Sequence, residues 1–146
     1  MGEISRALGQ GSEFEFEGRK YVLSPWTFDI QGKFERYLEE QAFRVARRMA
    51  ATMPQDEADR LLRGVAEDIT TGKYTFGQKA WAEATTAIPH LQYLVFLMLQ
   101  PHQPDVTLDG VKKIFEKDME LIYQKVAEVN ADPSKAKTAE PVAPSP

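Results

Sequence analysis

The sequence predicts a mainly α-helical protein, with a small N-terminal β-hairpin followed by a four- or five-helix bundle and a disordered C-terminal tail. Polar and apolar residues alternate strictly near the N-terminus, whereas apolar residues recur at three- and four-residue steps along most of the chain. Residues 131–146 have almost no apolar side chains to bury. We therefore expect a flexible leader at 1–12, a single helical domain at 13–130 that includes the hairpin, and a disordered tail at 131–146.

The hairpin is predicted from two alternating runs, Glu13–Glu17 and Lys20–Leu23, with Gly18 between them. Residues paired across antiparallel strands share a face of the sheet. The apolar side chains therefore fall on one face, whether the turn is at 17–18 or at 18–19. These side chains are Phe14, Phe16, Tyr21 and Leu23.

A long amphipathic helix is predicted directly after the hairpin. Ser24 can cap its N-terminus, and Pro25 suits the first helical position because its missing N–H group needs no partner there. Apolar residues then recur at helical spacing from Trp26 to about Met53. Pro54 ends this helix, and a second, shorter helix should follow and end near Gly72.

Three further helices complete the predicted bundle. Thr75 and Gln78 have the spacing of a capping box, which predicts a helix from about Phe76 towards Ile88, interrupted by Pro89. The run 91–99 is apolar nearly all round, as in a central buried helix, although its β-branched and aromatic residues leave a strand as the alternative. The last helix should be capped by Thr107 and carries a clear apolar stripe from Val111 to Val129.

Composition argues against several classes of function. The formal net charge of −4 gives no electrostatic reason to bind nucleic acid. The absence of cysteine removes disulfides and thiolate chemistry, which favours the cytoplasm. The longest apolar run, 91–99, is about half the roughly 20 residues that a membrane helix needs. We therefore expect a cytoplasmic protein without nucleic-acid or membrane partners.

No motif predicts catalysis, a metal site or a cofactor. His90 and His102 are the only imidazoles, and neither stands in a metal-binding spacing. Phosphate-binding glycine motifs and the serine nucleophile motif are missing. The alternating Glu13, Glu15 and Glu17 fit the solvent face of the hairpin better than a carboxylate site.

Aromatic and basic residues in the first third of the chain predict a partner-binding surface. Eight aromatic residues lie between Phe14 and Phe43, more than one helix can turn towards one core. Phe28 and Phe43 lie off the main apolar stripe and are the candidate anchors. The basic cluster of Arg44, Arg47 and Arg48 could contact an acidic protein segment, and a solvated helix face is the alternative interpretation.

The order of these elements resembles that of the tail assembly chaperones of tailed bacteriophages. The resemblance rests on the strand–glycine–strand run 14–23, the long helix after Ser24-Pro25, the 91–99 helix and the segment 104–111 before the last helix, and it covers about Glu13–Asn130. It implies a small, helical, cofactor-free protein of the host cytoplasm. Such a protein would bind the long tape-measure protein and recruit tail-tube subunits; we also expect self-association.

Two other classes remain open. A different phage structural or connector protein, or a small helical adaptor that binds a partner helix, would share this composition and would stay in finished particles if it were structural. A small enzyme is the third interpretation, and it needs a pocket lined by convergent polar groups.

Overall fold

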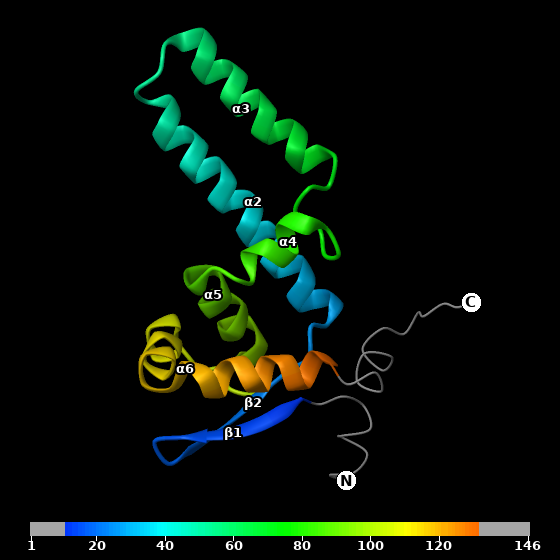
Figure 1. Ribbon diagram of the computed structural model, residues 1–146, viewed down its shortest axis with the longest axis vertical. Coiled ribbons are helices and arrows are strands. Elements are labelled where there is room, and N and C mark those ends of the chain that lie inside the picture. Colours follow the sequence, from blue (N-terminus) through cyan, green and yellow to red (C-terminus); the bar gives the residue numbers. More distant parts are fainter. Residues whose placement is uncertain (1–10, 132–146) are drawn as a thin grey trace, which may run out of the picture. The chain divides into compact units, whose positions relative to one another are not determined.

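The computed structural model describes residues 11–131 and confirms the predicted fold class. A two-stranded antiparallel hairpin precedes five helices (Figure 1). The elements are β1 (Ser12–Phe16), β2 (Arg19–Leu23), α2 (Phe28–Ala50), α3 (Gln55–Thr70), α4 (Lys79–Ala84), α5 (Ile88–Leu99) and α6 (Leu108–Ala131). Most of the predicted leader and all but the first residue of the predicted tail lie outside the described residues.

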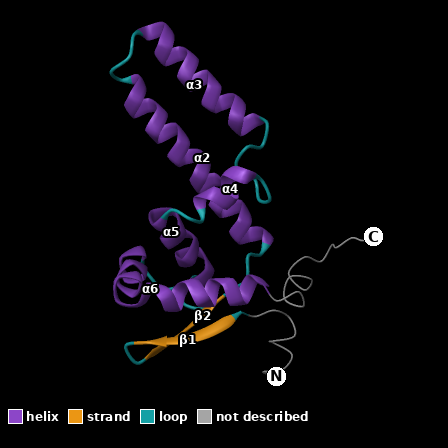
Figure 2. Ribbon diagram, in the orientation of Figure 1, coloured by secondary structure: helices purple, strands orange, loops and turns teal. Residues whose placement is uncertain are grey.

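The described residues form two compact units. The hairpin unit consists of residues 11–30 and 88–131, and the α2–α3 unit consists of residues 31–87. One boundary therefore falls inside α2, and the other falls just before α5. Figure 2 shows that both described strands belong to the β1–β2 hairpin. The prediction of one domain over 13–130 stays a prediction.

The hairpin turns at Glu17-Gly18, with positive φ angles of 51° and 79°. A two-residue turn in which both residues have positive φ matches the right-handed twist of the strands, and glycine adopts this conformation without steric cost. The register pairs Phe14 with Tyr21 and Ser12 with Leu23. The rings of Phe14 and Tyr21 stack with centroids 5.3 Å apart, which confirms that they share a face.

The core of the hairpin unit is built from α5, α6 and the apolar face of the hairpin. The helix α5 contacts β2 and α6, and α6 also contacts both strands. The fully buried side chains in this core include Leu23, Leu94, Val95, Met98, Leu99, Ile114 and Ile122. The prediction of a buried helix at 91–99 is therefore confirmed, and the strand alternative is wrong. Pro89 lies in its first turn, where a missing N–H costs little, so the expectation that Pro89 interrupts the preceding helix was wrong.

The first long helix starts later than the sequence predicted. Ser24 is buried, and its backbone N–H donates to the carbonyl of Met98 at 2.9 Å, so it belongs to the hairpin core and does not cap a helix. Thr27 takes the capping role, because its hydroxyl oxygen accepts the N–H of Ile30 at 3.3 Å. The helix α2 begins at Phe28, after these contacts are made.

The last helix confirms its predicted cap but contains an unpredicted kink. The Thr107 hydroxyl oxygen accepts the N–H of Gly110 at 3.0 Å. Asp118 has non-helical angles of φ −153° and ψ 67°, and its carboxylate accepts the N–H of Leu121 at 3.3 Å. A kink leaves backbone N–H groups without helical acceptors, so Asp118 acts as the cap of the second segment.

The α2–α3 unit has a small aromatic core near α4. The Trp81 ring packs edge-on against Phe34 and Phe76, with centroids 5.1 Å and 4.8 Å away. The capping box was wrong: the Thr75 hydroxyl donates to the Gly72 carbonyl at 2.8 Å, and the helix starts only at Lys79. Residues 76–78, which the sequence assigned to this helix, lie instead in the turn before α4.

Candidate partner-binding surface

The predicted anchors Phe28 and Phe43 lie on α2 but in different units. Phe28 is 56% exposed, whereas Phe43 is half-buried. The Arg47 guanidinium carbon lies 5.8 Å from the centroid of the Phe43 ring, a cation–π arrangement. Arg44, Arg47 and Arg48 are exposed. A joint role for these five residues stays a prediction.

A second apolar surface runs along α2 within the α2–α3 unit. Leu38, Ala42, Val45 and Met49 follow one another at steps of four, three and four residues, the spacing of a coiled-coil seam. The side chain of Leu38 is only 5% exposed. Val45 and Met49, further along the same seam, are 45% and 48% exposed. This stripe is therefore buried at Leu38, half-buried at Ala42 and open to solvent at Val45 and Met49.

The next helix continues this surface. After a turn at 51–54, α3 returns antiparallel to α2 (Figure 1). Its apolar residues are also spaced by four, three and four residues, at Ala58, Leu62, Val65 and Ile69. Leu61 adds one more apolar side chain next to Leu62. Ala58 is the one buried residue of α3, and the larger apolar residues are all half-buried.

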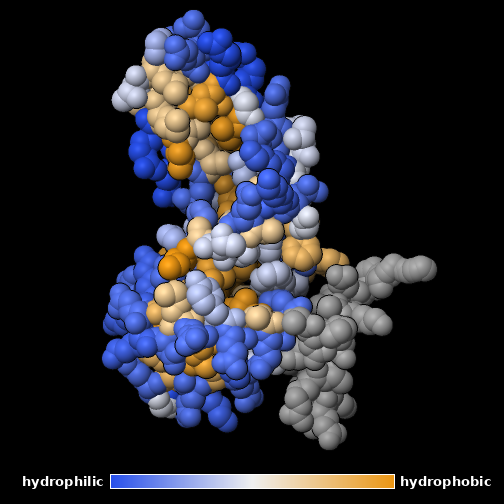
Figure 3. All heavy atoms as spheres, viewed as in Figure 1, coloured by the Kyte–Doolittle hydropathy of each residue, from blue (hydrophilic) through white to orange (hydrophobic). Residues whose placement is uncertain are grey.

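We call the partly exposed apolar residues of both helices the apolar seam; they are Ala42, Val45, Met49, Leu61, Leu62, Val65 and Ile69. Figure 3 shows apolar residues gathered in a band on the visible face of the α2–α3 hairpin. Apolar residues with this spacing normally pack between helices, where their side chains are buried. The two helices α2 and α3 leave the residues of the apolar seam partly exposed, so another element is needed to bury them.

The two helices differ in charge. The second half of α2, residues 41–50, carries three arginines and no acidic residue. In contrast, α3 carries five acidic residues and two arginines. The apolar seam is thus bordered by a basic helix and an acidic helix. A partner on the apolar seam should therefore present acidic groups next to α2 and basic groups next to α3.

The histidine and carboxylate side chains elsewhere in residues 11–131 form no candidate metal site. His90 lies at the start of α5, where burial lowers its pKa below the usual value. His102 is exposed after α5. Within residues 11–131, no three histidine, aspartate or glutamate side chains are placed to hold a metal ion together. No described helix is both long and apolar enough to cross a membrane.

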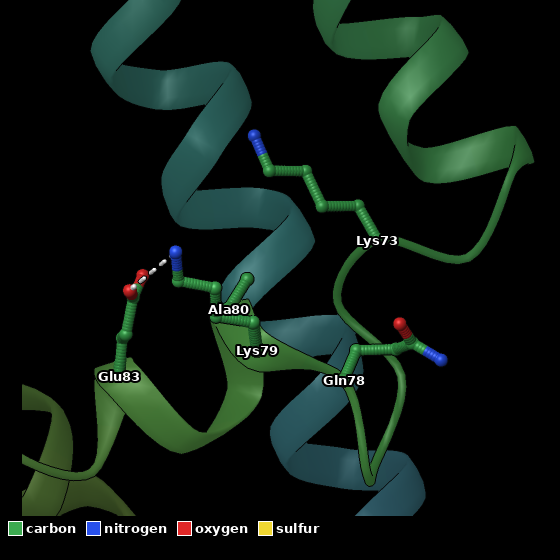
Figure 4. A pocket seen from close by; sticks show the side chains of 5 residues that line it. All are labelled: Lys73, Gln78, Lys79, Ala80 and Glu83. Carbon is green, nitrogen blue, oxygen red and sulfur yellow. Dashed lines mark ion pairs between the residues drawn. The ribbon is translucent and has the colours of Figure 1, made fainter.

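A hollow of about 290 Å³ lies beside α4 (Figure 4). Its lining residues are Lys73, Gln78, Lys79, Ala80 and Glu83. The Lys79 ammonium lies 3.8 Å from the Glu83 carboxylate, and both side chains are largely exposed. Figure 4 shows the Gln78 amide pointing away from this ion pair. The Gln78 amide therefore does not converge on the same point of the hollow as the Lys79–Glu83 pair.

No protein-family model, curated protein or solved structure matches this chain. The residues themselves must therefore carry any argument about function.

The apolar seam was missed at the sequence level because its residues were assigned to a core stripe. Helical spacing shows which residues share a face, but it does not show whether another element covers that face. One signal for this surface was present in the sequence. The apolar stripes of α2 and α3 continue to Met49 and Ile69, and α3 has few other apolar residues that could cover them.

Proposed function

We propose that this protein is non-catalytic and holds a helical segment of another polypeptide on the apolar seam. The observation that carries the proposal is the half-exposure of Val45 and Met49, which continue a stripe that is buried at Leu38. Exposed apolar groups in register on a helix are typical of helix-in-groove recognition.

The free energy gained by burying exposed apolar side chains favours binding of such a partner. Fully burying a valine or methionine side chain gains roughly 1.5–3 kcal/mol relative to full exposure. Val45 and Met49 are about half exposed, so each has part of that gain still available. A partner helix with apolar residues at three- and four-residue steps would pack along both α2 and α3.

The client that we propose is the tape-measure protein of a tailed bacteriophage. The resemblance to tail assembly chaperones implies such a client, together with recruitment of tail-tube subunits. A long helical client has apolar faces that need cover until assembly, and the apolar seam is suited to provide it. Phe43 and the arginines of α2 would add contacts at the rim. A phage connector protein or a helical adaptor is the alternative.

The first test is capture of a tape-measure fragment by the purified chain. Val45→Ser combined with Met49→Ser should weaken capture at least tenfold, because the exposed apolar groups are lost while the buried core is untouched. Glu40→Gln, on an exposed position of the same helix, is the matched control and should bind normally. Circular dichroism should show an unchanged fold in both variants.

Two results would contradict the proposal. Full-affinity capture by the double serine variant would place the interface elsewhere. If the wild-type chain captures no fragment, the chaperone function fails. A separate variant, Phe28→Ala with Phe43→Ala, tests the predicted aromatic anchors: weaker capture with an intact fold would assign them to the interface, and unfolding would assign them to the core.

A further inference from the structure

We infer that the apolar seam is also a homodimer interface, covered in the free protein by a second copy of the chain. The dimer does not depend on the proposed function. Only its consequence, that the client and the second copy compete for the seam, rests on that function.

The angular order of residues around the helices shows that the seam is half of a four-helix arrangement. Consecutive residues of an α-helix are about 100° apart. Starting from the buried Ala46, Met49 lies about 60° around α2, Val45 about 100° and Arg48 about 160° in the same direction. The distal half of α2 thus has a buried face at Ala46 and a second, exposed apolar face at Met49 and Val45.

On α3, Val65 lies about 20° and Leu61 about 60° from the buried Ala58, and the exposed Glu57 and Arg60 follow at about 100° and 160° in the same direction. In a four-helix bundle each helix packs against two neighbours. The helices α2 and α3 lie side by side (Figure 1), and each has an apolar direction left for a second neighbour.

Charge complementarity identifies that neighbour as a second copy. The distal half of α2 carries three arginines and no acidic residue, and its Arg48 is exposed beyond the seam. In contrast, α3 carries five acidic residues against two arginines, and its exposed Glu57 lies next to Leu61 around the helix. A two-fold axis parallel to the helices places α2 of one copy against α3 of the other. It therefore brings a basic helix against an acidic helix twice.

The register supports the same pairing. Ala46 lies four residues before the end of α2, and Ala58 lies three residues after the start of α3, so the two buried alanines stand at about the same height of the antiparallel α2–α3 hairpin. Counting in opposite directions from this level, Arg48 and Glu57 stand within one helical turn of the same height. Rotation about an axis parallel to the helices preserves height, so Arg48 of one copy faces Glu57 of the second copy.

The test is a charge-swap experiment followed by sedimentation equilibrium over a wide concentration range. The wild-type chain should form dimers. Arg48→Glu alone and Glu57→Arg alone should each dissociate at least tenfold more readily, because each variant places like charges opposite one another twice. An equimolar mixture should recover the dimer, since both intermolecular contacts then join opposite charges.

The mixture separates contacts between copies from contacts within one chain, because mixing leaves every intrachain pair unchanged. A wild-type chain that stays monomeric at all concentrations overturns the inference. So does a mixture that fails to dimerise when the wild-type chain does. Met49→Glu is a second variant: it should abolish the dimer without charge rescue, and an unaffected dimer would also overturn the inference.

These outcomes are distinct from failure of the proposed function. Sedimentation uses the purified chain alone, whereas capture uses the tape-measure fragment. Glu57→Arg keeps Val45, Met49 and the arginines of α2 and frees the seam, so it should capture the client at least as well as the wild-type chain. A dimer without capture would refute the proposed function alone, and capture without a dimer would refute this inference alone.

Discussion

Phe14 shows how a single side chain fixes the hairpin to the helices. It is buried and stacks on Tyr21, whereas its neighbour Glu15 is exposed. Phe14→Ser should lower the free energy of unfolding by roughly 3 kcal/mol or more, through lost apolar burial and a newly buried hydroxyl. Urea denaturation measures this difference, with Glu15→Ser as the control. Equal stability of the two variants would mean that the hairpin does not dock.

At the scale of an element, α6 depends on a cap in its interior. Asp118 interrupts the helical angles and accepts the N–H of Leu121. Asp118→Ala should destabilise the protein by about 1 kcal/mol, because that N–H loses its acceptor. Asp118→Asn keeps an acceptor oxygen and should lose only a fraction of this amount, as urea midpoints would show. An alanine variant as stable as the wild type would show that the kink needs no cap.

For the whole molecule, burial is concentrated in the hairpin unit. Most large buried side chains belong to β2, α5 and α6, whereas α3 buries only Ala58. Amide hydrogen exchange should therefore be faster in α3 than in α5 and α6, because local opening costs less where few apolar contacts are lost. In α3, protection should rise with protein concentration if the second copy covers the apolar seam. Slower exchange in α3 than in α5 at low concentration would contradict this expectation.

The sequence by itself determined the features that depend on local periodicity. Alternation placed Phe14 and Tyr21 on one face, and an almost wholly apolar run made 91–99 a buried helix, because side-chain direction follows from backbone geometry alone. Thr107 was recognisable as a cap because its partner is three residues away.

Only the tertiary structure decided what depends on distant neighbours. Ser24 does not cap α2, because its hydroxyl donates to the Pro25 carbonyl and its backbone N–H donates to the carbonyl of Met98, far along the chain. Leu38 and Met49 lie on the same stripe, yet one is buried and the other is half exposed. Periodicity assigns residues to a face, but burial depends on which other elements pack against that face, and this is why the apolar seam emerged only from the folded protein.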